Sequence, residues 1–265
     1  MLTANMTAPA TISHTALVTG AARRIGRAIA LDLARHGWAV IVHYNRSKAE
    51  AETVVAKIRE EGGTAELLQT DLSVEADVET LVSRAADALG SIGLLVNNAA
   101  TFEDDSALTA TRSSWDNHME ANLRAPFLLS QAMATALQGK VDDEGIIINI
   151  LDQRVRNLTP NFMSYTHSKS GLWTLTRTLA MALAPRIRVN AIAPGPTLVS
   201  DRQSEEQFQR QWQAVPLQHG PSVAEICQAI EFLIASASVT GQLIALDGGE
   251  HMGWAQPSQG IVHDE

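Results

Sequence analysis

The chain has 265 residues, of which 45% are hydrophobic, and it carries a net charge of −9 at pH 7. This length fits one large domain or two small ones, and the apolar share can supply a large core. The acidic balance, with no cluster of lysine and arginine, argues against nucleic acid as a partner. The single cysteine, Cys227, excludes a disulfide framework, and its apolar surroundings favour a packing role.

The first residues, MLTANMTAPATISHT, contain no lysine or arginine and no long apolar run. They therefore resemble neither a secretory signal nor a transit peptide. No stretch approaches the ~18 continuous apolar residues of a membrane span. We expect a cytoplasmic protein with no membrane partner, and one domain over residues 13–255 between flexible tails at 1–12 and 256–265.

Short β-rich segments alternate along the chain with longer helical patterns. Strands are predicted at 15–20, 38–44, 65–72, 93–99, 145–151, 186–195 and 243–249, and helices near 24–36, 48–61, 74–89, 113–138, 164–184 and 222–236. The strands are continuous apolar runs, which is typical of a sheet covered by helices on both faces. The alternation predicts an α/β fold, a single-domain Rossmann-type doubly wound parallel sheet of about seven strands. Its ligand should lie outside the carboxyl ends of the strands.

One region interrupts this alternation. Residues 196–221 are polar, rich in glutamine and bracketed by Pro196 and Pro216. A long polar segment between core elements is typical of a lid, so we expect it to cover a ligand site. Trp212 lies within it and is a candidate substrate contact.

The first strand leads into VTGAARRIGRAIA, residues 18–30. Gly20 can form the tight turn and Gly26 lets the helix approach the sheet, so backbone N–H groups and the helix dipole would face a pyrophosphate. Two glycines before a helix also occur in purely structural turns, so this motif alone is a weak signal. Arg24 between them would place a permanent cation beside the phosphates.

The second strand and the residues after it distinguish NAD from NADP sites. An NAD site places a carboxylate about 20 residues past the glycine turn, whereas an NADP site omits the acid and offers cations. Residues 39–49 contain no Asp or Glu, and Arg46 and Ser47 stand at a helix start. Ser47 could instead merely cap the helix, with Arg46 solvated. We predict NADPH or NADP as cofactor; Asp71 could accept from the adenine amino group or serve in a loop or helix cap.

The chain has only two tyrosines, and each has a lysine four residues later. This spacing puts both side chains on one face of a helix, one turn apart. Tyr44 closes the second strand, whereas Tyr165 opens a long helix after the fifth. Only Tyr165 is therefore expected to face the crevice at the carboxyl ends of the strands.

Five motifs, TGAARRIG, NNA, NLRAPF, YTHSK and NAIAPG, occur in order over about residues 15–250. Together they resemble the short-chain dehydrogenase/reductase family. The resemblance implies that Tyr165 is the proton donor, that Lys169 lowers its pKa and binds the nicotinamide ribose, and that Asn122 organises a water-linked proton relay. A free tyrosine has a pKa of about 10, and a nearby ammonium favours the phenolate. Asn122 could also satisfy a carbonyl where its helix bends.

The sequence departs from the usual family pattern at Asp152, thirteen residues before Tyr165, where most members have serine. The aspartate resembles the pteridine reductase branch, in which an acid here takes part in protonating a ring nitrogen. Arg24, at the middle-glycine position, and the segments HYNRS, NNAATF and VPLQHGPSVAEI resemble that branch too. The Asp152 carboxyl and the Tyr165 phenol, if close together, would titrate as a coupled pair. Desolvation in a partly dry crevice would push the aspartate toward its protonated form. Asp152 could instead be a loop acid paired with Arg154 or Arg156.

By the same resemblance, Phe102 would stack on the pterin ring opposite the nicotinamide, Phe162 could line the other wall, and Arg24 would also reach the substrate. Phe102 could simply be core. The eight histidines show no metal spacing, so no metal is expected. The predicted cofactor-binding residues are Gly20, Arg24, Ile25, Gly26, Tyr44, Asn45, Arg46, Ser47, Asp71, Leu72, Asn98, Ala99, Lys169, Pro194 and Gly195.

These residues predict an NADPH-dependent reductase that acts on a dihydropterin-like substrate, with Tyr165 and Asp152 assisting protonation. An alternative is a carbonyl or 3-oxoacyl thioester reductase in which Asp152 only hydrogen-bonds. A third hypothesis, an NADP-sensing protein without turnover, is disfavoured by the intact Tyr165, Lys169 and Asn122. Family resemblance implies a homotetramer, with LIALDGGEHMGW near a subunit contact.

Overall fold

The computed structural model describes residues 11–140, 143–200 and 202–253. The predicted C-terminal tail at 256–265 and most of the predicted N-terminal tail lie outside these ranges. The tail prediction was too long at one point, because Thr11–Ile12 form strand β1, which pairs in parallel with the start of β6 at Asp143 and Glu144.

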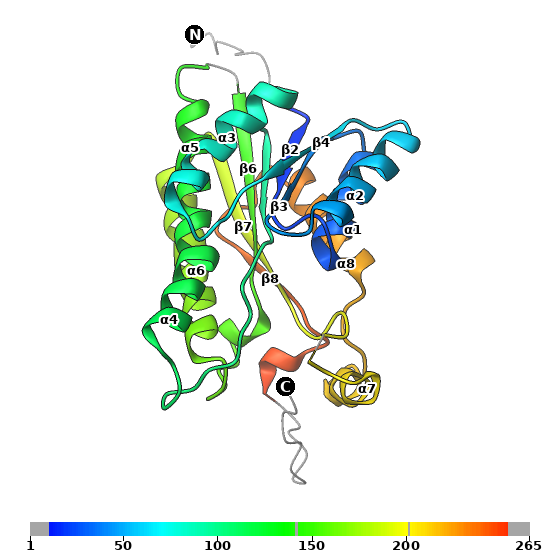
Figure 1. Ribbon diagram of the computed structural model, residues 1–265, viewed down its shortest axis with the longest axis vertical. Helices are drawn as coiled ribbons and strands as arrows, with labels where there is room; N and C mark the ends of the chain where they lie inside the picture. The colour runs from blue at the N-terminus through cyan, green and yellow to red at the C-terminus, as the bar shows by residue number, and fades with distance from the viewer. Residues whose placement is uncertain (1–10, 141–142, 201, 254–265) are drawn as a thin grey trace, which may run out of the picture.

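Seven parallel strands form the main sheet, in the order β4-β3-β2-β5-β6-β7-β8 (Figure 1). They are β2 (Thr15–Val18), β3 (Ala39–Tyr44), β4 (Ala65–Gln69), β5 (Leu94–Asn97), β6 (Asp143–Ile150), β7 (Ile187–Pro194) and β8 (Leu243–Leu246). All neighbouring pairs are parallel. The predicted doubly wound sheet is therefore confirmed. Its spatial order reverses between β2 and β5, which places the ligand crevice at their carboxyl ends.

Helices cover both faces of the sheet, and for this reason its central strands are apolar along their whole length. One face carries α1 (Arg24–Arg35), α2 (Lys48–Glu60) and α8 (Val223–Ala235), whose buried side chains form one core cluster with the strands. The other face carries α3 (Glu75–Leu89), α5 (Ala125–Ala136) and α6 (Met163–Ala182), which bury a second cluster. Figure 1 shows these two groups on opposite sides of the strands.

The long helix predicted at 113–138 is divided into three parts. It consists of α4 (Arg112–Met119), a π-helical turn η1 (Glu120–Arg124) and α5. Pro126 is the second residue of α5, two residues after the last residue of the π turn, and has no N–H to donate into the helix. Turns of this kind occur mostly as single bulges in helices, often at functional sites, and this one carries Asn122.

The polar segment predicted as a lid contains a helix, α7 (Glu205–Ala214), which the sequence interpretation missed. Its start is capped reciprocally by Ser204 and Gln207. Only Phe208 in this helix is buried, and most of its other residues are Glu, Gln or Arg, so the segment does not look like a core helix in the sequence. In the described part of the chain, no helix combines the length and apolar character needed to cross a membrane.

Candidate active site

A cleft of about 820 Å³ opens at the carboxyl ends of the strands, where the order of the sheet reverses. Its walls include all but two of the predicted site residues. Those lining it are Gly20, Arg24, Ile25, Gly26, Tyr44, Asn45, Arg46, Ser47, Asp71, Leu72, Asn98, Ala99, Phe102, Asp152, Tyr165, Lys169, Pro194 and Gly195. Segment 196–211 contributes further residues, including Phe208 and Gln211, so the predicted lid borders the cleft.

The glycine turn after β2 leaves room only for glycine at both of its glycine positions. Gly20 has φ +64°, and a Cβ there would lie 3.0 Å from the Cα of Ala99. A Cβ on Gly26 would lie 2.3 Å from the carbonyl oxygen of Gly20. The backbone itself therefore forms this wall of the cleft, as a pyrophosphate site requires. Arg24 has φ +53°, which explains why its position favours glycine.

His43 supports this turn from β3 and was not among the predicted site residues. Its Nδ1 accepts from the backbone N–H of Gly20 at 3.0 Å, so Nε2 carries the proton and donates to the carbonyl of Thr70 at 3.1 Å. Burial lowers the pKa of His43 to about 4, although the bond to Thr70 opposes this shift. The ring is therefore neutral near pH 7. The only sequence signal was a polar residue inside an apolar strand.

The nucleotide end of the cleft fits a phosphate better than a ribose hydroxyl. Arg46 is exposed there and forms no ion pair with any described residue, and Ser47 makes no capping bond through its side chain. The capping alternative for Ser47 is therefore wrong. Arg23, which was not predicted, also lines this end and lies 3.9 Å from Glu50. Cations and free helix N–H groups at this position are the features that accept a 2′-phosphate.

Asp71 is occupied within its own loop. Its Oδ1 accepts from the backbone N–H of Ser73 at 2.9 Å and from the Ser73 hydroxyl at 2.7 Å. These bonds lower the pKa of Asp71, against a smaller opposing effect of burial. Of the two alternatives for Asp71, the structure shows the loop role, at a position that also borders the cleft.

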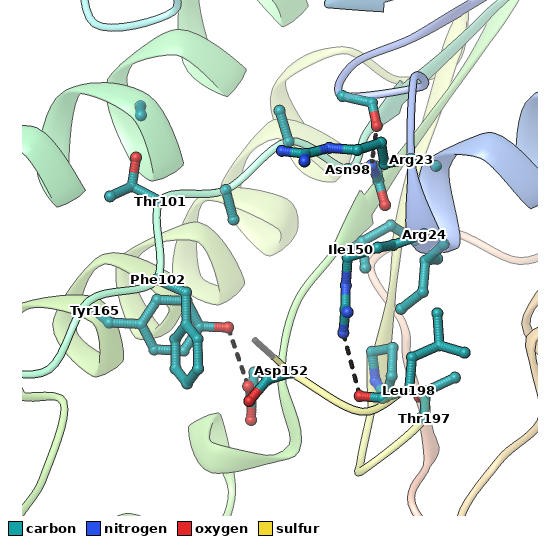
Figure 2. Close-up of a pocket in the computed structure, with 18 of the residues that line it drawn as sticks. Arg23, Arg24, Asn98, Thr101, Phe102, Ile150, Asp152, Tyr165, Thr197 and Leu198 are labelled. Carbon is teal, nitrogen blue, oxygen red and sulfur yellow. Dashed lines mark hydrogen bonds between the residues drawn. The ribbon is translucent and has the colours of Figure 1, made fainter. Parts of the chain in front are cut away.

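Tyr165 and Asp152 meet at the other end of the cleft (Figure 2). The Tyr165 hydroxyl donates to Asp152 Oδ2 at 3.0 Å. Lys169 lies one helical turn further, with Nζ 5.8 Å from the centre of the Tyr165 ring and bonded to the Ile150 carbonyl at 2.8 Å. Burial lowers the pKa of Lys169 to about 8, while the charge of Asp152 opposes the shift. Asp152, Tyr165 and Lys169, which were predicted as catalytic residues, therefore lie next to one another.

Asp152 is also paired with Arg154, as the loop-acid alternative predicted. Its Oδ1 accepts from the backbone N–H of Arg154 at 2.8 Å, and its Oδ2 lies 3.3 Å from Nη1 of the same arginine. Arg156 does not take part in this pair. The guanidinium of Arg154 therefore contacts Oδ2 of Asp152, while the backbone N–H of the same residue contacts Oδ1.

Phe102 forms an aromatic wall beside this group and lies at the cleft, as predicted. Its ring is 4.6 Å from the Tyr165 ring and nearly perpendicular to it. Phe162 does not line another wall: it is 2% exposed and stacks behind Phe102 at 4.5 Å. Its backbone has φ +54°, in the left-handed region that residues other than glycine rarely adopt. The guanidinium groups of Arg154 and Arg202 lie 5.6 and 5.5 Å from the Phe102 ring.

Asn122 is fully buried behind the cleft and does not line it. Its side chain accepts from the N–H of Thr101 at 2.8 Å and donates to the carbonyl of the same residue at 2.9 Å. It also donates to the Ser168 hydroxyl at 3.0 Å. Asn122 therefore holds the segment that leads to Phe102, which agrees with the expectation that it satisfies a carbonyl.

Two arginines tie segment 196–203 to the walls of the cleft. Arg24 donates to the carbonyls of Leu198 and Val199 at 3.1 and 2.6 Å, so its side chain reaches this segment beyond the glycine turn (Figure 2). Arg202 donates to the Phe102 carbonyl at 2.6 Å. Trp212 does not border the cleft and lies instead near His219, with the ring centres 5.9 Å apart.

Away from the cleft, helices α1 and α8 bring together Asp32, His36 and Glu231. Their ligand-type atoms all lie within 4.8 Å of one another. Nδ1 of His36 is 3.0 Å from Glu231 and 3.6 Å from Asp32, and burial together with the neighbouring Glu231 raises the pKa of Asp32. Sequence spacing could not show this group, because its members come from two helices far apart in the chain.

Comparison with known proteins finds reductases related to this chain over most of its length. A family model described as enoyl-(acyl carrier protein) reductase matches residues 20–251. The 3-oxoacyl-[acyl-carrier-protein] reductase FabG of Staphylococcus epidermidis is 33% identical over 247 residues, covering 91% of this chain and all of that protein. A 3-oxoacyl-[acyl-carrier-protein] reductase of Synechocystis is 34% identical over 241 residues, covering 89% of this chain and 96% of that protein.

Two solved structures are more similar. FolM alternative dihydrofolate reductase 1 from Brucella canis, complexed with NADP, is 47% identical with a TM-score of 0.87, over 93% of this chain and 98% of that one. The Brucella suis protein of the same description, also in complex with NADP, is 49% identical with a TM-score of 0.89, over 93% and 99% of the two chains. Together with the Tyr165, Lys169 and Asp152 geometry, these matches show that the chain is an oxidoreductase of the short-chain dehydrogenase/reductase family.

Proposed function

We propose that the protein is an NADPH-dependent reductase that transfers hydride to a dihydropterin-like substrate, with protonation assisted by Tyr165 and Asp152. The observation that carries this proposal is the 3.0 Å hydrogen bond from the Tyr165 hydroxyl to Asp152, beside Phe102, which lines the cleft. The similarity to two FolM alternative dihydrofolate reductases supports the same substrate class.

The cofactor assignment rests on the nucleotide end of the cleft. Arg46, Ser47 and the start of α2 offer donors and positive charge where an NAD site would place a carboxylate. Both similar solved structures contain NADP. The cofactor is therefore NADP(H), held with its pyrophosphate at the glycine turn and its nicotinamide toward Lys169 and Tyr165.

When bound, NADPH supplies the hydride, and the side chains of this chain manage the proton. The substrate would receive the proton that Tyr165 and Asp152 share through their hydrogen bond, which leaves Tyr165 as the phenolate. The buried Lys169 ammonium, 5.8 Å from the Tyr165 ring, stabilises negative charge left on the phenol. Phe102 offers a flat apolar face for a planar heterocycle.

The second candidate is reduction of a 3-oxoacyl thioester, which the names of the sequence relatives favour. Reduction of a C=O bond adds one hydride to carbon and one proton to oxygen, just as reduction of a C=N bond adds one proton to nitrogen, and Tyr165 alone could supply the proton to oxygen. In that reaction Asp152 would only hydrogen-bond, and Phe102 would have no planar partner. The pairing of Asp152 with Tyr165 is therefore the feature that favours a C=N substrate.

The test compares NADPH consumption with dihydropterins, dihydrofolate and 3-oxoacyl thioesters in parallel. We expect pterin-type substrates to be reduced with a kcat/KM at least about tenfold above that of the thioesters, a difference of ~1.4 kcal/mol in transition-state binding. Tyr165→Phe is the control, since it removes the donated proton and should abolish turnover while NADPH still binds. Faster reduction of thioesters would overturn the pterin assignment, and binding of NADPH without turnover of any substrate would favour a sensing protein.

We also propose a homotetramer, as family resemblance implies, and a cytoplasmic location. The edge strand β8 and helix α8, with Phe232 53% exposed, offer an apolar surface for a subunit contact. Light scattering coupled to gel filtration measures the assembly, and cell fractionation measures the location. A monomeric mass at micromolar concentration would contradict the first proposal.

A further inference from the structure

Helix α6, which carries Tyr165, begins without a capping side chain of its own. The residue before it, Phe162, has φ +54° and makes no cap hydrogen bond. The first N–H groups of a helix need hydrogen-bond acceptors. A non-glycine residue keeps a positive φ only when the surrounding structure holds its backbone in that conformation. Some other part of the chain must therefore fix the first turn of this helix.

Asp105 supplies those acceptors from the loop between β5 and α4. Its carbonyl oxygen accepts from the N–H of Met163 at 3.1 Å, and its Oδ1 accepts from the N–H of Ser164 at 2.9 Å. Its Oδ2 accepts from the hydroxyls of Ser164 and Ser114. One residue, 59 positions away in sequence from Ser164, thus binds the first two N–H groups of α6.

The Asp105 side chain is built into the protein and is not a surface acid. It is 4% exposed. Burial acts to raise the pKa of Asp105, but the bonds from Ser164 and Ser114 outweigh it and the pKa lies below its usual value. The group is therefore a carboxylate near pH 7, and a negative charge at a helix N-terminus is stabilising.

His118 ties the same loop to the same helix at a second point. Its Nε2 accepts from the N–H of Glu103 at 3.1 Å, so Nδ1 carries the proton. That Nδ1 lies 2.8 Å from the carbonyl of Ser114 and 2.8 Å from the hydroxyl of Ser164. His118 is fully buried. Loop, α4 and α6 therefore share one hydrogen-bonded cluster of Asp105, Ser114, His118 and Ser164.

We infer that Asp105 is a positioning residue, which holds the proton donor Tyr165 and the aromatic wall Phe102 in fixed register. Tyr165 follows Ser164 directly, and Phe102 lies three residues before Asp105 on the same loop. The two rings contact each other 4.6 Å apart, at the point where substrate and acid meet. This inference rests on the proposed role of Tyr165 as proton donor, but not on the substrate being a pterin.

The kinetic test uses Asp105→Ala, Asp105→Asn and the neighbouring Asp104→Asn as a matched control, since Asp104 is exposed. Misplacement of a catalytic group by about 1 Å can cost on the order of 100-fold in rate, so Asp105→Ala should lower kcat by about that factor and raise the substrate KM. The NADPH dissociation constant should not change. Asp105→Asn keeps an oxygen acceptor for Ser164 and should recover most of kcat, and Asp104→Asn should behave as wild type.

A second measurement needs no substrate. The chain has only two tyrosines, so protein labelled with 3-fluorotyrosine gives two ¹⁹F signals, which Tyr44→Phe assigns. Asp105→Ala should move or broaden the Tyr165 signal and leave the Tyr44 signal in place.

An unchanged Tyr165 signal, or a loss of NADPH affinity as large as the loss of kcat, would overturn the inference. If wild type does not reduce pterins, the proposed substrate fails, while the same variants assayed with a carbonyl substrate, together with the ¹⁹F signals, still decide the role of Asp105.

Discussion

Asp152 is the residue at which the choice of substrate can be tested. It accepts a hydrogen bond from Tyr165 and two from Arg154. Asp152→Ser keeps a hydrogen-bonding group but removes the carboxylate, so pterin reduction should fall by about 10²-fold or more, the scale of a lost acid–base contribution. Reduction of a carbonyl test substrate by the same variant should change little. Steady-state rates on both substrates measure this, and equal losses would mean that Asp152 has no special role toward nitrogen.

Lys169 should make activity and stability depend on pH in opposite directions. Its folded pKa of about 8 lies below the ordinary value of 10.5, because the ammonium is buried. Between these values the unfolded chain binds more protons than the folded one, so the contribution of Lys169 to stability rises with pH across that window. Below about pH 8 both states are protonated and the full cost of burial remains.

The proposed mechanism uses the Lys169 ammonium, so kcat/KM should decline as pH rises through about 8. Urea unfolding of wild type and Lys169→Met at several pH values gives the stability contribution. The free energy of unfolding of wild type, relative to the variant, should increase between pH 8 and pH 10.5. A constant difference across that range would contradict the burial of a charged lysine.

At the scale of the element, the glycine turn depends on β3 through His43. The pKa of this ring is lowered from 6.5 to about 4 by burial. As pH falls below 6.5, His43 becomes protonated in the unfolded chain, whereas in the folded protein it stays neutral until about pH 4. The free energy of unfolding therefore decreases with falling pH in that window.

His43→Asn removes this titration, while its amide can still accept from Gly20. From pH 6.5 to pH 5, wild type should lose about 2 kcal/mol of unfolding free energy that the variant retains, at ~1.4 kcal/mol per pH unit. Urea melts of both proteins at the two pH values provide the measurement. Parallel losses in both would show that His43 is protonated in the folded state.

Some elements follow from the sequence and others do not, for physical reasons. Buried parallel strands are continuous apolar runs, so seven strands and most helices are visible in the sequence, and the crevice follows from strand order. Helix α7 buries only Phe208, and its mostly polar sequence does not mark it as a core element. The π turn before α5 depends on hydrogen-bond geometry that residue types do not encode.

The candidate site was predictable to the same degree. Tyr165, Lys169 and Asp152 stand in a recognisable motif, and Phe102 follows the NNA segment. Asp105 and Ser164 are 59 residues apart, so no local pattern links them. The Phe162 ring was predicted to line the cleft, but it is buried against Phe102. Neither its residue type nor its hydropathy indicates the left-handed backbone found there.

At the scale of the whole molecule, cofactor binding should raise thermal stability selectively. A ligand at about 100 times its Kd stabilises the folded state by ~2.7 kcal/mol, which corresponds to a rise in Tm of roughly 5–10 °C for a domain of this size. NADPH should produce this rise at concentrations at which NADH does not. Arg46→Ala should remove most of the difference, and a wild type stabilised more by NADH would refute the 2′-phosphate assignment.

The short pairing of β1 with the start of β6 determines at which end of the chain a purification tag can be attached without lying near the cleft. Thr11 and Ile12 lie at the amino ends of the strands, while Glu250, close to the last described residue, borders the cleft at their carboxyl ends (Figure 1). A purification tag or fluorophore fused ahead of Thr11 would stand at the far pole from the reaction. A tag attached after Gly253 would instead lie beside the cleft, so an immobilised enzyme should be attached through its N-terminal end.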